Sequence, residues 1–238
     1  MFKLRLAMFC FSIAFCLANL IGLASVNSDR SLFAIARLLE EGKPLTSSFL
    51  GKYENWFDAI GSRTMCLPTR QRAVVTLRLS VLDTRLSELQ SGDVDNITDV
   101  DEAFADALVA IRRLLNCSPA DGNAWLRLAM VTTKSEGLSE SGLAALERSL
   151  WLAPHESWVV NVRAEFVARL IKLGLIEPHV ALVLRADALT LARAGNRSDI
   201  NHFLKLGRHL AIESIHSALP LLEPHRRKEV ESILEIIK

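Results

Sequence analysis

Glycine and proline are scarce in this chain, with 11 Gly and 7 Pro among 238 residues. Together they make up roughly 8% of the residues, below the usual level of about 12%. A β-sandwich or barrel needs turns at short, regular intervals and uses these residue types to make them. The scarcity of turn formers, together with a single Tyr, therefore argues against such folds.

The chain also lacks an excess of charge of either sign. It has 28 Lys and Arg against 27 Asp and Glu, which gives a formal net charge of +1. A general nucleic-acid binder needs a basic surplus to neutralise phosphates, so we expect no nucleic-acid partner. Half of the residues are hydrophobic and 23% are charged, which is too apolar for a disordered chain. The length fits one or two folded domains.

Sequence motifs of common catalytic and cofactor sites are absent as well. The chain contains no glycine-rich phosphate loop, no His-Glu-x-x-His, no Cys-x-x-Cys and no Gly-x-Ser-x-Gly. These absences lower the prior for common hydrolases, zinc enzymes and nucleotide-binding proteins. We therefore expect a protein that is not an enzyme, with no catalytic residues, no cofactor and no metal ion.

A long charge-free stretch lies at the N-terminus, where residues 6–28 run for 23 residues without Asp, Glu, Lys or Arg. An apolar stretch of about 20 residues spans the hydrocarbon core of a bilayer, whereas the core of a cleavable signal has about 7–15. We therefore predict that residues 1–28 form an uncleaved signal-anchor, that is, a single transmembrane helix. The alternative is a secretory signal that is cut after Ala24.

The charges that flank this stretch set the expected topology. Lys3 and Arg5 favour a cytoplasmic N-terminus. Arg30, Arg37 and Lys43 on the other side oppose them, so the bias is weak. A five-residue head followed by a long domain is more typical of an anchor with its N-terminus inside. We expect a single-pass protein of a bacterial inner membrane whose soluble domain lies in the periplasm.

Two cysteines, Cys66 and Cys117, belong to the predicted soluble part. Each is followed two residues later by a proline at an expected junction between helices. In an oxidising compartment they could form a disulfide across 51 residues, which would stabilise the fold by about 3–5 kcal/mol. The alternative is two buried thiols that never meet, because spacing alone cannot show that they are close.

Apolar residues recur at helical spacing almost everywhere after residue 28. We predict an N-terminal group of helices in residues 29–90, a polar, acidic connection at 91–101, and a larger helical region at 102–238. In the first group we expect helices near 31–41, 47–60 and 70–90, the last despite a strand-like alternation at 75–81. Further helices are expected near 101–116, 122–134, 139–152, 156–173, 177–194, 198–217 and 223–237.

A run of short helices with short connections packs either as a bundle or as a solenoid of hairpins. Internal repetition favours the solenoid. Pro119 and Pro154 lie 35 residues apart, and Trp125 and Trp158 lie 33 apart. The residues that precede each proline repeat one spacing, Ala107 and Ile111 in the first unit and Gly142 and Leu146 in the second.

This pattern resembles the tetratricopeptide repeat, which has a period of about 34 residues, over residues 103–170. In such a repeat a large residue early in the first helix fills the space between hairpins, and the proline ends the second helix. The predicted repeat core residues are Trp125, Leu128, Pro154 and Trp158. Thr132 departs from the pattern, which has Tyr there. The alternative is two unrelated hairpins with tryptophans at these positions by chance.

A second resemblance lies on the same part of the chain. Residues 114–125 read LLNCSPADGNAW, and residues 152–158 read LAPHESW. Together with the apolar N-terminal stretch, they resemble small membrane-anchored helical proteins encoded in bacterial capsule and exopolysaccharide gene clusters. That resemblance implies an accessory role in polysaccharide biosynthesis or export, with protein partners from that machinery.

Three clusters of polar residues are candidates for chemistry. His202, His209 and His216 share one helical stripe with Glu213, and together they suggest metal ligands. A single helix rarely closes around an ion, so we interpret the stripe as a solvated face. The acidic residues at 101, 102 and 106 are interpreted as a helix start. The basic run at 225–228 begins the last expected helix, with an anionic partner or lipid as the alternative.

The sequence thus predicts an all-α protein with an N-terminal transmembrane helix followed by a TPR-like helical-hairpin solenoid. We expect a non-catalytic, membrane-anchored scaffold or adaptor whose stacked hairpins present a concave surface to protein partners. Two alternatives stay open at this point. One is a secreted helical protein, and the other is a glycan-modifying enzyme with an unrecognised site.

Overall fold

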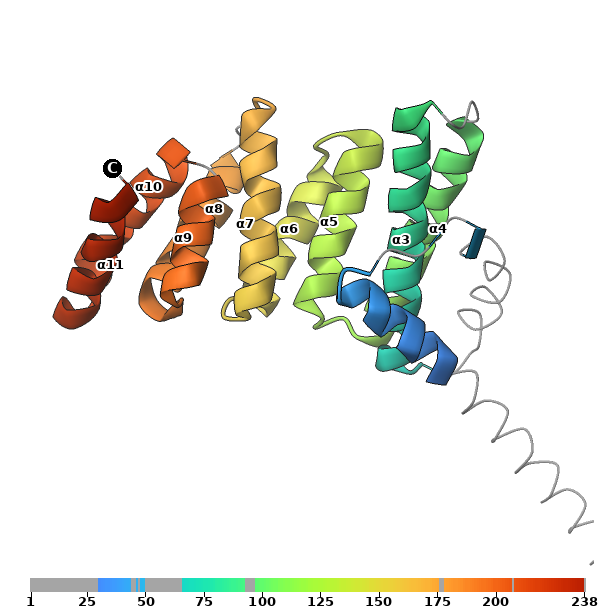
Figure 1. Cartoon of the computed structure of the whole chain (residues 1–238), viewed down its shortest axis with the longest axis horizontal. Coiled ribbons are helices and arrows are strands. Elements are labelled where there is room, and N and C mark those ends of the chain that lie inside the picture. The colour runs from blue at the N-terminus through green and yellow to red at the C-terminus, as the bar shows by residue number, and fades with distance from the viewer. Residues whose placement is uncertain are drawn as a thin grey trace, which may run out of the picture. The chain divides into compact units, whose positions relative to one another are not determined.

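The computed structural model describes residues 30–43, 46, 48–49, 66–92, 97–175, 178–206 and 208–237 (Figure 1). Within these ranges all regular secondary structure is helical and no strand occurs, which confirms the all-α class. The predicted signal-anchor at 1–28 and most of the helix expected at 47–60 lie outside these ranges. Among the helices that are described, none is both long enough and apolar enough to cross a bilayer.

Most helices lie where the apolar spacing predicts them. The first spans 30–40. The following helices are α3 (Pro68–Ser91), α4 (Ile97–Cys117), α5 (Gly122–Glu136), α6 (Glu140–Leu152), α7 (Ser157–Lys172), α8 (Pro178–Ala194), α9 (Arg197–Leu206), α10 (Arg208–Ala218) and α11 (Pro224–Ile237), with the 3-10 turn η1 (Leu219–Leu221) before the last. Helix α4 begins at Ile97, inside the stretch predicted as a polar connection.

The prediction of one helix over 198–217 is wrong, because this region forms two helices, α9 and α10. Gly207 stands between them in the sequence, and glycine costs about 1 kcal/mol relative to alanine inside a helix. The two helices also differ in their main neighbours, since α9 packs mostly against α7 and α10 mostly against α8.

The chain divides into two compact units, Met1–Ala110 and Ile111–Lys238, within α4. In the first unit, α3 is buried on all sides from Ala73 to Arg78. This explains the strand-like alternation in its sequence, since a helix surrounded by protein needs no polar face. Its buried polar groups find partners: Arg78 forms an ion pair with Asp106 at 3.1 Å, and the Thr76 hydroxyl donates to Glu40 at 3.4 Å.

In the second unit, helices α5 to α10 pack as three hairpins in two layers (Figure 1). The hairpins are α5 with α6, α7 with α8, and α9 with α10. Helix α7 contacts both α5 and α9, so these three form what we call the odd layer. Helix α8 contacts both α6 and α10, so these three form the even layer. Helix α11 then packs against α8, α9 and η1.

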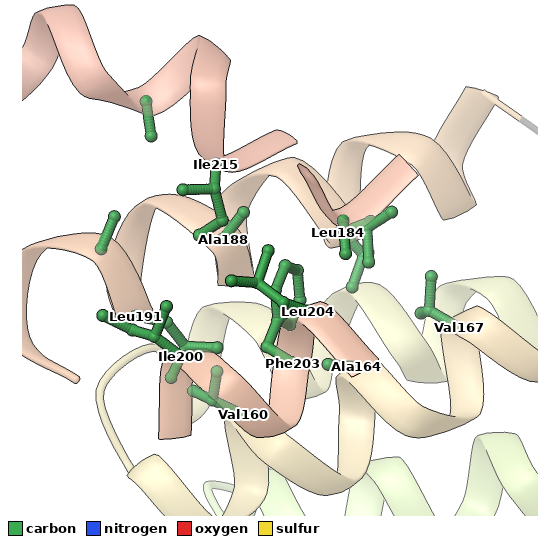
Figure 2. Packing of buried hydrophobic residues seen from close by; sticks show 14 of the residues in the cluster. Val160, Ala164, Val167, Leu184, Ala188, Leu191, Ile200, Phe203, Leu204 and Ile215 are labelled. Carbon is green, nitrogen blue, oxygen red and sulfur yellow. The ribbon is translucent and has the colours of Figure 1, made fainter. Parts of the chain in front are cut away.

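A single apolar core runs between the two layers. Its centre combines residues from α7, α8, α9 and α10, which point toward one another in Figure 2: Val160, Ala164, Val167, Leu184, Ala188, Leu191, Ile200, Phe203, Leu204 and Ile215. Full burial of one such Val, Leu, Ile or Phe side chain contributes about 1.5–3 kcal/mol. This core therefore holds the hairpins together.

Side-chain caps fix where the helices of this unit begin. The Asp121 carboxylate accepts the backbone N–H three residues on at 3.0 Å, and the Ser139 hydroxyl does the same for α6 at 3.3 Å. At α9, Asn196 and Asp199 accept each other's backbone N–H groups at 2.9 and 3.3 Å, which is a reciprocal capping arrangement. These caps satisfy amide groups that otherwise lack partners.

Candidate functional site

Three of the four predicted repeat core residues, Trp125, Leu128 and Pro154, are half-buried. Trp125 and Leu128 pack against the apolar core. The indole N–H of Trp125 donates to the carbonyl oxygen of Pro119 at 2.8 Å. The Arg148 guanidinium of α6 lies over the Trp125 ring, 4.5 Å from its centroid, in a cation–π contact. Trp125 therefore connects the turn before α5 with the outer side of α6.

The prediction that Trp158 is a core residue is wrong, because 52% of its surface is exposed. The next two residues, Val159 and Val160, are fully buried instead. The repeat pattern assigns its large core residue to position 158. In α7 that position lies on the exposed side of the helix, and the buried side is a different one. The second-helix positions behave differently, since Leu146 is buried and Gly142 brings α6 close to Thr133 of α5.

A charged network that the sequence did not predict lies in the core of the second unit. Arg163 of α7 and Asp187 of α8 are both 0% exposed. Arg163 Nη2 and Nε donate to the two carboxylate oxygens of Asp187 at 2.6 and 2.9 Å. Arg163 Nη1 also donates to the hydroxyl and the carbonyl oxygen of Ser149 at 3.1 and 3.0 Å, and the guanidinium reaches the carbonyl oxygen of Ala153 at 3.4 Å.

These contacts connect three helices at the C-terminal end of α6. Burial raises the pKa of Asp187 to about 6, and it outweighs the hydrogen bonds and positive charge of Arg163, which lower that pKa. The sequence did carry a signal for this network: each residue interrupts an apolar helical face, as Arg163 does between Val160 and Val167. The identity of the partner, 24 residues away, could not be read from that signal.

The two arginines of the basic run at 225–228 make internal contacts, whereas His225 and Lys228 are exposed. Arg226 donates to the carbonyl oxygens of Ala192 at 2.7 Å and Leu191 at 3.3 Å, and also to that of Gly195. Arg227 donates to the carbonyl oxygen of Leu219 at 2.9 Å. The two arginines thus satisfy carbonyl groups where α8 ends and in η1, which favours the structural interpretation of this run over an anionic partner.

The structure also places the histidines and acids that sequence analysis selected. His202 contacts Glu165 of α7 at 2.9 Å, Glu213 and His216 are exposed, and the side chain of His209 lies outside the described residues. Asp106 pairs with Arg78, whereas Asp101 and Glu102 are exposed. Across the part of the chain that the structure covers, no three His, Cys, Asp or Glu side chains are arranged to hold a metal ion.

Two histidine–glutamate contacts join neighbouring helices of the same layer. His202 and Glu165 join α9 to α7 in the odd layer. His179 and Glu147 join α8 to α6 in the even layer. All four side chains are at least one-third exposed, so each pair adds little stability.

Cys66 and Cys117 are both disulfide-bonded. That they bond to each other stays a prediction, which peptide mapping can test.

The outer side of the odd layer is the candidate interaction surface. Val162, Glu165 and Arg169 recur three or four residues apart along α7, and so they share one side of that helix. Val162 is an exposed hydrophobic residue, and Arg169 is an exposed cation. His202 of α9 adjoins them through its contact with Glu165. We call this set the odd-layer surface; it can bind a partner that has both apolar and charged groups.

Comparisons with protein-family models, with curated proteins and with solved structures find no match to this chain.

Proposed function

We propose that the chain is a non-catalytic helical-repeat scaffold or adaptor that binds other proteins. The observation that carries this proposal is the packing of α5 to α10, in which three hairpins stack so that alternate helices form two layers. Tetratricopeptide-like solenoids pack in this way, and they use an extended surface of successive helices to bind partners.

Two features of the second unit suit this role. The odd-layer surface combines side chains of α7 with His202 of α9, so it extends over two neighbouring hairpins. The buried contacts of Arg163 join α6, α7 and α8, so neighbouring hairpins keep a fixed spacing. A binding surface that is already ordered avoids part of the entropy cost of association.

The proposed location and pathway rest on the sequence. The apolar stretch at 6–28 supports a single transmembrane anchor in a bacterial inner membrane, with the helical part in the periplasm. The segments at 114–125 and 152–158 support an accessory role in exopolysaccharide or capsule biosynthesis or export. The proposed partners are therefore membrane-bound synthesis or export proteins.

The test is crosslinked copurification of the full-length protein from detergent-solubilised membranes, with two matched variants. Val162→Asp places a charge on the odd-layer surface, where Val162 is exposed. Leu182→Asp places the same charge on α8 in the even layer, where Leu182 is also exposed. Because neither side chain is buried, both variants should fold, as circular dichroism can check.

We expect the parent and Leu182→Asp to retain the same partners, and Val162→Asp to lose them. Equal retention by both variants would place binding elsewhere and contradict the role of the odd-layer surface. Recovery of the parent alone, with crosslinking shown to work, would remove the scaffold proposal. Mass spectrometry of the mature N-terminus separates the anchored protein from a secreted one, because cleavage after Ala24 removes the anchor.

A further inference from the structure

One edge of the second unit exposes large apolar side chains. Helix α6 ends and α7 begins on either side of a short turn, and Trp151 and Trp158 flank that turn with 80% and 52% of their surface exposed. Leu152 is 39% exposed beside them. Leu221, which is 60% exposed, lies in η1 just after α10.

These residues lie at the same end of the unit. Successive helices are antiparallel neighbours joined by short turns, so α6 and α10 of the even layer run in the same direction. Figure 1 shows the turn between α6 and α7 and the turn before α11 at the lower end of the unit. We call this end the tryptophan edge and define it by Trp151, Leu152, Trp158 and Leu221.

The fold does not use the indole groups of this edge. Among the described residues, the N–H groups of Trp151 and Trp158 have no protein acceptor, whereas the indole of Trp125 donates to Pro119. Isolated surface leucines need no explanation, but two largely exposed tryptophans around one turn mark a contact site. A tryptophan has a broad apolar ring and one polar N–H, so it fits an environment that is apolar on one side and wet on the other.

The charges around the edge help to identify the occupant. Arg193 and Arg197 flank the turn between α8 and α9 at the same end, and both are exposed. Glu156 and Glu223 are exposed at the neighbouring turns, so exposed charges of both signs border the edge. The occupant that complements this edge has an apolar interior, hydrogen-bond acceptors for the indole N–H groups and charges of both signs. The headgroup region of a phospholipid bilayer has all three.

We propose that the tryptophan edge rests in the headgroup region of the bilayer in which the chain is anchored. This inference rests on the proposed anchor at residues 6–28. That segment ends two residues before the helix at 30–40, so it keeps the rest of the chain near the bilayer. Tethering raises the effective concentration of the surface, and a weak contact through Trp151 and Trp158 then suffices. Tryptophan is enriched at membrane interfaces for the same physical reason.

The test uses full-length protein that contains 5-fluorotryptophan, reconstituted in phosphatidylcholine vesicles with a small fraction of lipid that carries a headgroup nitroxide. Trp151→Phe and Trp158→Phe assign the two fluorine signals. The control is Leu173→Trp, which adds a fluorotryptophan where α7 ends, away from the edge, at a side chain that is 73% exposed. The exposure of Leu173 lies between the exposures of the two edge tryptophans.

We expect the nitroxide to broaden the Trp151 and Trp158 signals strongly and to leave the signal at position 173 sharp. Equal broadening at all three positions, or at none, would overturn the inference. Sharp Trp151 and Trp158 signals that broaden only with a soluble nitroxide would show an edge free in water. Sharp signals protected from both reagents would indicate a protein on the edge instead.

Flotation of the same vesicles after carbonate washing keeps the two proposals apart. Protein that is stripped from the vesicles would contradict the anchor itself, and the edge inference would fall with it. Protein that floats while Trp151 and position 173 respond alike would retain the anchor and contradict only the edge inference.

Discussion

The buried pair of Arg163 and Asp187 allows a double-mutant cycle whose outcome can be worked out from the contacts. Asp187→Leu leaves the Arg163 guanidinium in a site closed to water without its carboxylate. Removing one partner of a buried ion pair costs about 3–5 kcal/mol. Arg163→Met should cost at least as much, because it also removes a donor to Ser149 and Ala153 of α6.

The double variant should be more stable than either single variant. With both charges gone, the carbonyl oxygen of Ser149 keeps its helical hydrogen bond from the backbone N–H of Ala153 at 2.9 Å. The carbonyl oxygen of Ala153 loses its arginine donor, and one unsatisfied buried acceptor costs about 1–3 kcal/mol. The coupling energy between the two sites should therefore reach several kcal/mol.

Urea unfolding followed by far-ultraviolet circular dichroism measures these free energies of unfolding. Arg185→Met is the matched control, since Arg185 is an exposed cation on the same helix as Asp187. It should change the free energy of unfolding by no more than about 0.5 kcal/mol. A double variant whose loss equals the sum of the two single losses would falsify the reasoning, because the pair would then carry no coupling.

The same pair has a pH dependence whose sign separates burial from ion pairing. The pKa of Asp187 is raised from 3.8 to about 6 in the folded protein. Between these values the folded state binds more protons than the unfolded state, so this group's contribution to stability falls as the pH rises. The destabilisation caused by Asp187→Asn should therefore be larger at the acidic end of that window than at neutral pH. A dominant ion pair would give the opposite trend.

Three more results are expected from other parts of the chain. Gly122→Ala should cost about 1–3 kcal/mol in thermal unfolding, because the added Cβ would lie 2.5 Å from a side-chain carbon of α6's terminal turn; an unchanged melting temperature would contradict the close approach. Trp125→Ala should lower the free energy of unfolding by about 2–3 kcal/mol, less than the loss expected for a fully buried tryptophan. Trp151→Ala should change it by at most about 0.5 kcal/mol. Similar losses for the two variants would contradict the half-buried position of Trp125 and the exposed position of Trp151. Non-reducing peptide mapping should find Cys66 joined to Cys117, and reduction should then lower stability by about 4 kcal/mol; a mixed pairing would contradict that prediction.

The positions of the helices could be predicted because each one carries its own local signals. Asp121 and Ser139 cap α5 and α6, close to the starts expected near 122 and 139, and Gly137, with a φ of +81°, lies just after α5 and favours its end. The division of 198–217 was missed because the apolar spacing continues through it. The sequence does not show that the two halves pack against different helices, α9 mostly against α7 and α10 mostly against α8.

The candidate site was harder to predict because it depends on the side of each helix to which a residue points and on contacts between residues far apart in the sequence. A repeat pattern gives the residue type at Trp158 but not the rotation of α7, which turns that ring outward and buries Val159. Similarly, Arg163 is visible in the sequence as a charge on an apolar face, but its carboxylate comes from the next helix. Only the packed hairpins bring the two together.

Arginine side chains bind carbonyl oxygens at the C-terminal ends of α6 and α8 and in the 3-10 turn that follows α10. Arg163 donates to carbonyl oxygens where α6 ends, Arg226 does so for α8, and Arg227 for η1 after α10. The last carbonyls of a helix lack internal partners and attract cations, so each arginine joins a helix end to the helix that carries it. Because the guanidinium groups of these three arginines bind carbonyl oxygens within the fold, they do not contribute to a surface that contacts partners. The tryptophan edge lies at the same end, and its exposed indole rings and leucines are the groups that the fold leaves available for contact.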